Sequence, residues 1–466
     1  MPQSWTQPPN VAVVGGGLAG LAAACALGST GFHVTLFERR PYLGGRASSY
    51  QHPGTGEVVD NCQHVLFGCC TNLVEFYRRI GVDSKIHWFN QMTFIEPGGR
   101  ATVMNESGLP APLHTAPAFL RFPFLEVIDK VAIARALAAL IPLPLRDNGQ
   151  SFLTWLQNHG QTEKSIERFW KPILVSALNE DIDRVSISSA GQVVRESLRS
   201  PHARHMGVPQ IPLTDLYDAA RSYIESHGGE VRFRTSAESF RAELSHVQLG
   251  IGGRDEVFDY AVLALPFDGL ASILPNTSAA QALRDSLSRF ETSPITGIHL
   301  WFDREISDLD HAVLLDRTIQ WMFHKSKLQK RENNGHGSYV ELVVSSSKGL
   351  VEKSKQEIVD LAVSELREFF PAAREANLVK STVIKEIHAT YSPKPGIDLN
   401  RPRAETIWPR VFLAGDWTAT GWPATMEGAV RSGYQAAQSI ARVAGKRDAT
   451  FLVPDLPATG FMRLFG

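Results

Sequence analysis

Cysteine is scarce in this chain, which has 4 cysteines among 466 residues and no C-x-x-C pair. So few cysteines in so long a chain exclude a disulfide scaffold and favour a reducing compartment. The first nine residues are polar and contain prolines, so they do not resemble a signal peptide, and we expect no segment that spans a bilayer. We therefore expect a cytoplasmic protein, either free or peripheral on the inner face of the membrane.

Charge of either sign is not in excess. The 47 basic and 48 acidic residues give a formal net charge of -1, which gives no reason for binding nucleic acid. Cysteines and histidines do not follow one another at the spacing of a metal site, so we expect no bound metal. At this length we expect two intertwined domains.

The first forty residues have the order of a nucleotide-binding unit. An apolar strand at 11–14 leads through glycines into a small-residue helix at 18–27, and a second parallel strand follows at 34–37. Glu38 ends that strand, where a carboxylate can accept hydrogen bonds from a ribose. This order of strand, helix, strand and acid is much more specific than a glycine motif alone.

The glycines of this unit have separate roles. Gly15 permits the tight turn, Gly17 lets the backbone approach a pyrophosphate, and Gly20 allows helix and strand to pack closely. Leu18 and Ala19 begin the helix, whose N-terminus faces the phosphate charge.

A second strand, turn and helix stand near the C-terminus. Residues 411–417 read as a short apolar strand stopped by Gly415 and Asp416, and a helix is expected from Met426 to about residue 443. A dinucleotide whose two halves lie far apart needs two such contact regions, whereas a mononucleotide needs only the first. The two ends of the chain together predict a dinucleotide site.

Several segments between these ends have weaker signals. The face of an expected helix at 126–141 that carries Val127, Val131, Ala134, Ala138 and Ile141 is either buried in the core, a membrane-surface contact or an apolar-substrate entrance. The tail 451–466 either packs on the body or helps a membrane contact. We expect one strand over 230–237 and an exposed loop over 325–337.

Three further motifs carry a resemblance to a known family. They are Gly44-Gly45-Arg46, Gly415-Asp416 and Met426-Glu427-Gly428-Ala429. With the glycine loop, they make the chain similar to the flavin-dependent amine oxidase and phytoene desaturase superfamily. The resemblance implies noncovalent FAD and an α/β fold, in which a Rossmann-like FAD-binding domain of the two-dinucleotide-binding flavoprotein type is interleaved with an α+β substrate domain. The expected division assigns 1–65, 206–268 and 405–447 to FAD binding, 66–205 and 269–404 to substrate binding, and 448–466 to a C-terminal tail.

The resemblance also implies roles for residues around the adenosine and the phosphates. The stretch 15–20 would hold the pyrophosphate, Glu38 the adenosine ribose, and Arg46 the phosphate charge. Arg39 and Gly45 belong to the same expected cofactor-binding set. Ala237 would present its backbone to the adenine.

The C-terminal motif would meet the other half of the cofactor. There Gly415 and Asp416 would face the ribityl-phosphate side, and Met426 would offer its backbone N–H near the flavin ring. Asp416 and Glu427 are alternatively a pair of acid–base carboxylates, but their place in the flavin motif favours a positioning role.

A narrower resemblance lies in residues 59–72, together with 295–302 and 415–418. These stretches are similar to the squalene-associated FAD-dependent desaturases, understood as hydroxysqualene dehydroxylases of bacterial squalene synthesis. Phytoene desaturases carry Gly-Pro where this chain has Cys62 and Gln63, so the dehydroxylase is favoured over a carotenoid enzyme.

The narrower resemblance implies reduction of an allylic alcohol, with hydroxysqualene, a long apolar isoprenoid, as substrate. Hydroxide is a poor leaving group, so a general acid is needed in a water-poor pocket. His64 and Asp60 are the candidates for acid and orienter, although each has a purely structural alternative. Without a second nucleotide fingerprint, an external flavin reductase or free reduced flavin would re-reduce the FAD.

Two other functions stay open at this point. One is an FAD-dependent isoprenoid (carotenoid) desaturase or an amine oxidase. The other is a prenyl-chain-binding protein like the Rab escort and GDP-dissociation-inhibitor proteins, which have a similar fold without a working flavin. Intact Glu38, Arg46 and Asp416 favour an enzyme over such a binding protein.

Overall fold

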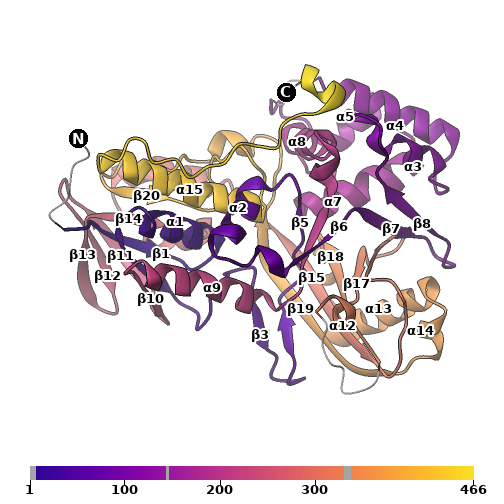
Figure 1. Ribbon diagram of the computed structural model, residues 1–466, viewed down its shortest axis with the longest axis horizontal. Helices are drawn as coiled ribbons and strands as arrows, with labels where there is room; N and C mark the ends of the chain where they lie inside the picture. Colours follow the sequence, from indigo (N-terminus) through magenta and orange to yellow (C-terminus); the bar gives the residue numbers. More distant parts are fainter. Residues whose placement is uncertain (1–6, 143–145, 330–336, 466) are drawn as a thin grey trace.

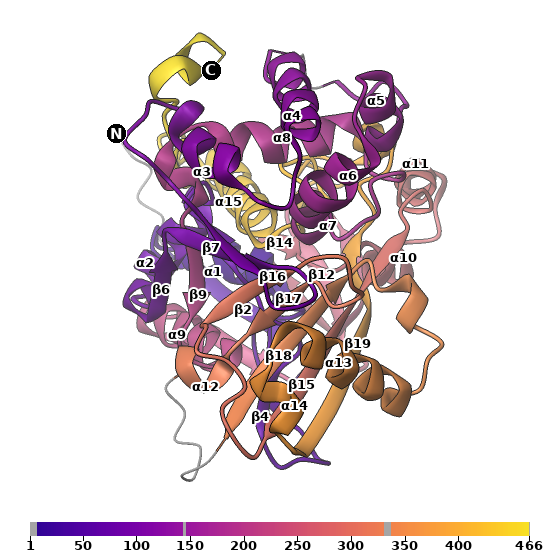
Figure 2. The same ribbon diagram turned by 90° about the vertical axis from the view of Figure 1, so that its right-hand side faces the viewer.

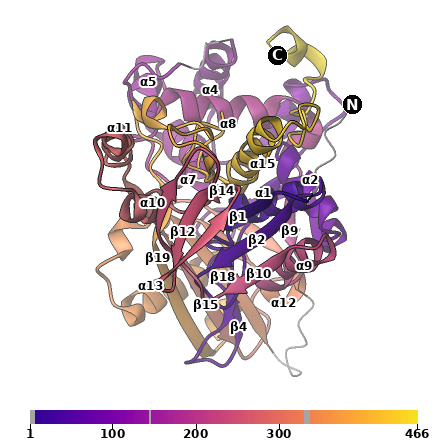
Figure 3. The ribbon, with the colours of Figure 1, turned by 90° about the vertical axis from the view of Figure 1, so that its left-hand side faces the viewer.

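A five-stranded parallel sheet forms the centre of the cofactor half of the protein. The computed structural model describes residues 7–142, 146–329 and 337–465. The strands stand in the order β10-β2-β1-β14-β20, and each neighbouring pair is parallel (Figure 3). They are β1 (Asn10–Val14), β2 (His33–Glu38), β10 (Glu230–Phe233), β14 (Tyr260–Leu263) and β20 (Val411–Leu413). The sheet therefore joins the two ends of the chain to its middle.

The helix after β1 is buried along its whole length. It is α1 (Leu18–Gly28), and α15 (Met426–Val443) lies beside it, with α9 (Leu213–Ser226) nearby (Figure 1). At Gly433 of α15, a Cβ atom would stand 2.1 Å from the carbonyl oxygen of Ala19. Only glycine allows the two helices to come so close. Because α1 is covered on all sides, it is apolar on all sides.

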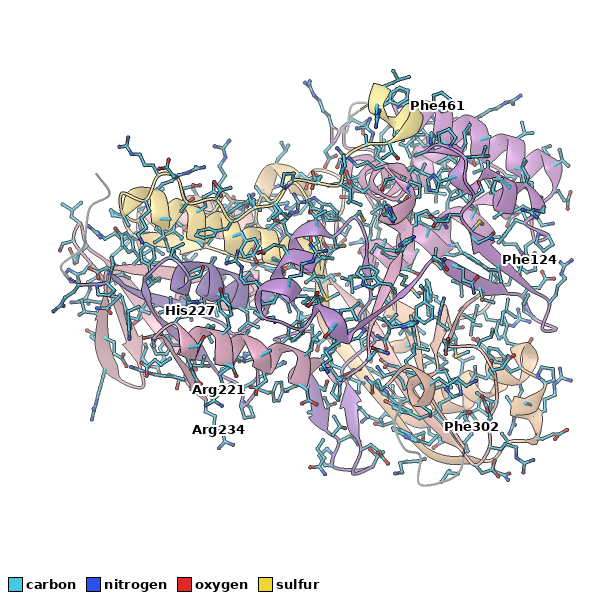
Figure 4. The ribbon with its side chains drawn as sticks, viewed as in Figure 1. Phe124, Arg221, His227, Arg234, Phe302 and Phe461 are labelled. Carbon is cyan, nitrogen blue, oxygen red and sulfur yellow. The ribbon has the colours of Figure 1, made fainter. Side chains whose placement is uncertain are left out.

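The segment expected as one strand over 230–237 is divided between two sheets. β10 ends at Phe233, and Arg234 has a φ of 55°, a conformation that L residues rarely adopt. Figure 4 shows Arg234 pointing away from the body beneath α9. The chain then enters an antiparallel three-stranded sheet of β11 (Ala237–Ala242), β12 (Val247–Ile251) and β13 (Arg254–Phe258). The prediction of a single strand was therefore wrong.

A seven-stranded mixed sheet forms the centre of the other half. Its order is β19-β15-β18-β17-β16-β7-β8, and β16 and β7 are its parallel pair. The strands are β7 (Gln91–Ile95), β8 (Ala101–Asn105), β15 (Thr292–Phe302), β16 (His311–Leu314), β17 (Trp321–Phe323), β18 (Ser338–Ser345) and β19 (Leu378–Tyr391). Helices α13 (Lys355–Phe369) and α14 (Ala372–Glu375) cover one face of it (Figure 2).

Two small sheets and several short helices connect these parts. β3 (Ser49–Gln51) pairs with β4 (Val58–Asp60), and β9 (Met206–Pro209) lies between β5 (Leu66–Phe67) and β6 (Ile86–Phe89). The connecting helices are α2 (Thr71–Arg79), α10 (Phe267–Ile273), α11 (Ser278–Leu287) and α12 (Lys325–Leu328). A helical layer completes the fold, with α3 (Ala116–Arg121), α4 (Val127–Leu140), α5 (Phe152–Asn158), α6 (Glu163–Ser165), α7 (Lys171–Leu178) and α8 (Ile187–Leu198).

Most residues of the apolar face expected for helix α4 are exposed to solvent. Its buried apolar side chains are those of Ala132, Ile133, Ala136 and Leu140. Val127, Val131, Ala134 and Ala138 are exposed, so placing this face in the core would be wrong; Ile141, just after the helix, is buried. Nearly every position of α4 is apolar, so periodicity could not choose between its sides. Asp129 is buried as well, because it accepts a hydrogen bond of 2.6 Å from Thr162 Oγ1.

The C-terminal tail packs on the helical layer. The backbone N–H of Phe461 donates to the carbonyl of Ala111 over 2.8 Å, and the Met462 side chain is buried. The side chains of Phe461, Leu464 and Phe465 are exposed by 53%, 77% and 47%. Figure 4 labels Phe461 on the C-terminal tail. In the described part of the chain, no helix has the length and apolar character needed to cross a membrane.

Candidate cofactor and active site

The glycine loop between β1 and α1 contains two glycines that packing demands and one that it does not. A Cβ atom at Gly15 would stand 2.4 Å from the carbonyl oxygen of Ala264, and one at Gly20 would stand 1.9 Å from that of Gly15. Gly17 has an ordinary φ of -77°, and the nearest atom to a Cβ placed there is Gly45 Cα at 3.9 Å. Glycine at position 17 therefore leaves open space where another molecule can approach the backbone.

The first turn of α1 begins at this open space and has backbone N–H groups that can still donate hydrogen bonds. Gly17 is the N-cap, and no side chain caps the helix. The backbone N–H groups of the first turn, which Leu18 and Ala19 begin, have no partner within the helix, and the helix dipole makes this end positive. The loop therefore fits a pyrophosphate.

Glu38 lies against the same loop at the end of β2. The N–H of Gly16 donates to Glu38 Oε2 over 2.7 Å, and the N–H of Arg40 donates to Oε1 over 2.7 Å. The buried carboxylate is thus fixed beside the glycine loop, where a ribose role is consistent with its position. The Arg39 side chain is exposed.

A second loop approaches the first and carries a cation. The N–H of Gly44 donates to the carbonyl of Gly16 over 2.9 Å, and a Cβ at Gly45 would stand 3.0 Å from Gly17 Cα. Arg46 Nη2 lies 2.6 Å from Asp416 Oδ1. Burial disfavours the Arg46 cation, but the Asp416 carboxylate outweighs it and raises the pKa of the guanidinium. This ion pair joins the N-terminal loops to the C-terminal motif.

The C-terminal motif is held by its own hydrogen bonds. The Gly415 N–H donates to Ser432 Oγ over 2.8 Å, and Thr425 caps α15 by accepting from the Gly428 N–H at 3.0 Å. Met426 is the first residue of α15. Asp416 is therefore buried at the approach to a helix N-terminus.

Glu427 does not pair with Asp416. Its carboxylate accepts hydrogen bonds from the backbone N–H groups of Asn72 and Leu73, at 3.1 and 2.8 Å, and from Arg431 at 2.6 Å. It therefore holds the start of α2 against α15, which is a positioning role.

Ala237 is the first residue of β11 and is buried in the same apolar cluster as Val14 and Phe37. Two residues earlier, the N–H of Thr235 donates to the carbonyl of Glu38 at the end of β2 over 3.0 Å, which brings this part of the chain to the cofactor half. Its contact with an adenine stays a prediction.

Asp60 is buried and ionised. Ser49 Oγ donates to Asp60 Oδ1 over 2.5 Å, the Leu213 N–H donates to the same oxygen over 3.2 Å, and Lys325 Nζ donates to Oδ2 over 2.5 Å. Burial disfavours the anion, but Lys325 and the hydrogen bonds outweigh it and lower the pKa of the carboxyl. Near neutral pH, Asp60 can orient a group or accept a proton.

His64 has one ring nitrogen fixed. Its Nδ1 lies 2.8 Å from the carbonyl oxygen of Cys62, and because a carbonyl only accepts, Nδ1 carries the hydrogen. Nε2 is therefore unprotonated in the neutral imidazole, and burial, which lowers the pKa of the ring, favours that neutral form. Among the residues that the structure describes, no hydrogen bond joins Asp60 to His64. The two candidates share a segment but act through different partners.

The sequence interpretation missed Lys325. Residues 325–337 were expected to form an exposed loop, but Lys325 begins α12 and is only 1% exposed, while 330–336 lie outside the described residues. Besides Asp60, its Nζ contacts Gln63 Oε1 at 2.8 Å and Glu341 Oε2 at 3.2 Å. Acidic residues at apolar strand positions, such as Glu341, signal a buried cation, because buried carboxylates need one.

His299 lies mid-strand in β15 and is buried. Its Nδ1 lies 2.9 Å from the Tyr339 hydroxyl of the neighbouring strand. This burial within the sheet is typical of a core histidine.

A cavity of about 560 Å³ lies between α8 and the C-terminal tail. Arg195, Glu196, Arg401 and Pro423 are among the residues that line it. Its charged lining does not suit a wholly apolar substrate, so we do not assign it to the isoprenoid.

Comparison with known proteins agrees with this geometry. A 15-cis-phytoene desaturase of Synechococcus elongatus is 27% identical over 458 residues, which cover 92% of this chain and 95% of the relative. A zeta-carotene desaturase of Synechocystis sp. is 27% identical over 474 residues, which cover 92% and 97%.

Solved structures share the fold at low sequence identity. An oxidoreductase from Methanosarcina mazei has a TM-score of 0.72 at 16% identity, over 93% of this chain and 100% of that one. Cyclohexylamine oxidase from Brevibacterium oxydans has a TM-score of 0.67 at 18% identity, over 94% and 99%. The model of the flavin containing amine oxidoreductases matches residues 18–441, from the start of α1 into α15. Since this match spans most of the chain, the chain belongs to the flavin containing amine oxidoreductase family, and its cofactor is FAD.

Proposed function

We propose that this FAD-dependent oxidoreductase removes the hydroxyl group of hydroxysqualene reductively and releases squalene, in bacterial squalene and hopanoid biosynthesis. The observation that carries the proposal is the contact between Gln63 Oε1 and Lys325 Nζ, 2.8 Å long. Phytoene desaturases have proline where this chain has Gln63, and a proline cannot make that contact. The residue that departs from the desaturase pattern, Gln63, thus makes a contact that a desaturase-like proline would lose.

The proton is assigned to residues of this chain. When bound and reduced by the external electron donor, FAD would supply the hydride for the reduction. His64 acts in its imidazolium form, which is the minor form near neutral pH because the pKa is lowered: Nε2 gives its proton to the departing hydroxyl, while the Nδ1 hydrogen stays bound to the Cys62 carbonyl. The lowered pKa makes the protonated imidazole a stronger acid toward a poor leaving group. The charge of Asp60 favours the protonated form, although burial of the ring has the larger and opposite effect.

Two observations support an apolar substrate: the names of the relatives and an exposed apolar surface of the protein. The relatives above are named for phytoene and zeta-carotene. We define the outer apolar surface as Leu120, Val127, Ile128, Val131, Phe461 and Leu464, which are exposed by 45% to 78%. They belong to α3, α4 and the tail, which lie at one end of the molecule (Figure 1). We infer that this surface lies on the cytoplasmic membrane and receives the substrate there, and that an external flavin reductase or free reduced flavin supplies electrons.

The activity is tested without oxygen. FAD-loaded protein is incubated with reduced flavin and hydroxysqualene, and squalene is measured by mass spectrometry. We expect squalene from the wild type and little from His64→Ala. Flavin-loaded protein that makes no squalene, but oxidises phytoene, zeta-carotene or an amine, would support the alternative enzymes. Protein that binds no FAD would support a prenyl-binding role.

The membrane contact has a matched control. Ile128→Asp combined with Leu464→Asp places charges on the outer apolar surface and should abolish cosedimentation with vesicles. Leu244→Asp changes a leucine that is 86% exposed in the turn between β11 and β12, so it should sediment like the wild type. Equal sedimentation of both variants would contradict the contact.

A further inference from the structure

Lys325 is a buried cation for which the proposed chemistry has no role so far. It stands at the start of α12, which lies beside β18 of the seven-stranded sheet (Figure 2). Burial of an ammonium group is costly unless carboxylates compensate its charge. Here Asp60 Oδ2 at 2.5 Å and Glu341 Oε2 at 3.2 Å do so. Lys325 therefore links Asp60 in the N-terminal part of the chain to Glu341 in β18.

Two of these contacts reach the segment that carries His64. Lys325 Nζ donates to Asp60 on one side and to Gln63 on the other, across about 260 residues of sequence. The Gln63 side chain continues the connection, because its Nε2 donates to the carbonyl of His64 over 2.9 Å. Lys325 is thus tied to the backbone of His64 through one side chain.

Asp60 has attachments from both halves. From the cofactor half it accepts hydrogen bonds from Ser49 and from the Leu213 N–H at the start of α9, and from the end of α12 it accepts a longer one of 3.4 Å from Gln329 Nε2. Glu341, by contrast, belongs to β18, where it stands opposite His299 of β15. Lys325 therefore connects the segment to the sheet of the substrate half.

We propose that Lys325 is a positioning residue: by binding Asp60 and Gln63 from the substrate half, it fixes where His64 stands and which charges face its ring. The inference rests on the proposed function, because it concerns the proton donor of that reaction. It does not make Lys325 a proton donor itself.

The charges around His64 make the inference testable. Burial lowers the pKa of His64, the Cys62 carbonyl and Asp60 raise it, and Lys325 and Arg46 lower it. Removal of the lysine charge should therefore raise the pKa of His64, whereas removal of the aspartate charge should lower it. If the pair were only structural, either change would open the site to water, and both would raise the pKa toward its ordinary value.

The experiment uses the FAD-loaded full chain with isotope-labelled histidine. The His64 resonance is identified among the 15 histidines by its loss in His64→Gln, and its pKa is followed by NMR. We expect a higher pKa in Lys325→Met, a lower one in Asp60→Asn, and a value nearer the wild type in the double variant. Lys348→Met, which removes another lysine paired to acids, is the control and should leave the pKa unchanged.

Activity provides the second readout. Lys325→Met should lower kcat for hydroxysqualene by about 10- to 100-fold, with KM changed by less than about threefold, because a misplaced proton donor slows the chemical step. Parallel rises of the pKa in both single variants, or unchanged kcat in Lys325→Met, would overturn the inference. Absence of squalene from the wild type would refute the proposed function instead. The pKa values measured by NMR would still test whether Lys325 and Asp60 determine the charges that face the His64 ring.

Discussion

Replacement of Gly17 by alanine separates the folding of the glycine loop from its use. Gly17 has a φ of -77° and a ψ of 175°, which alanine adopts freely, and the nearest atom to the added Cβ is 3.9 Å away. The apo protein should therefore fold as the wild type does. Alanine restricts the unfolded chain, which raises the free energy of unfolding by about 0.4–1 kcal/mol. At the N-cap of α1, however, alanine is less favourable than glycine, so we expect the net free energy of unfolding to be about unchanged.

The same methyl group occupies the space through which a phosphate would approach the backbone. A hydrogen bond from an N–H to a charged group contributes about 1.5–3 kcal/mol. Loss of one such bond corresponds to an increase of about 10- to 100-fold in the Kd for FAD. Gly17→Ala should thus combine about unchanged stability with much weaker cofactor binding.

Gly20→Ala is the matched control, because its Cβ would stand 1.9 Å from the carbonyl oxygen of Gly15. It should destabilise the apo protein by about 1–3 kcal/mol or more. Urea unfolding of the apo proteins and titration with FAD give the two quantities. If Gly17→Ala bound FAD within twofold of the wild type, or lost as much stability as Gly20→Ala, the open space would not be a cofactor site.

Three further predictions concern the pairing, the titration and the packing of buried groups. Arg46→Met should weaken FAD binding and lower the free energy of unfolding by about 1 kcal/mol, because it leaves Asp416 buried without its cation. The loss is kept small because the arginine side chain is 35% exposed, so that solvent partly screens the pair. A double-mutant cycle with Asp416→Asn measures the coupling, and additive losses would refute it. Burial lowers the pKa of His311 to about 4, below its ordinary value of 6.5, so its contribution to stability is present above pH 6.5 and is lost as the pH falls toward 4. In His311→Phe, the free energy of unfolding measured in urea should therefore fall less steeply between pH 6.5 and 4 than in the wild type. The same pH dependence in both proteins would refute the prediction. Gly433→Ala, whose Cβ would stand 2.1 Å from the Ala19 carbonyl, should separate α15 from α1 and lower stability by about 1–3 kcal/mol in calorimetry, whereas an unchanged Tm would refute that close approach.

The elements that depend on local spacing were predicted well. Helix 18–27 was expected and α1 spans Leu18–Gly28, and α15 begins at Met426 as expected. Glycines at fixed intervals constrain their own neighbours, so a single stretch of sequence suffices for such elements. The family and FAD follow from the same motifs, while the domain boundaries and the contacts of single residues with FAD stay predictions.

The elements that depend on distant partners were not predictable in the same way. The side of α4 that is buried is chosen by what packs on it, because its sequence is apolar nearly all round. The break at Arg234 needs a positive φ that its residue type does not announce. Lys325 is buried by acids that lie hundreds of residues earlier and in a neighbouring strand, so its own polar surroundings suggested a loop.

The central parallel sheet also bears on how the protein is made. β1, α1 and β2 leave the ribosome before the other strands of this sheet, and β10, their next partner strand, begins at Glu230. At a usual rate of synthesis, the unit waits about 10–40 s for that strand. During this time the wholly apolar α1 has no α15 to cover it, so we expect it to need a chaperone. Asp416 emerges later still, so the ion pair between Arg46 and Asp416 forms only after synthesis has passed residue 416.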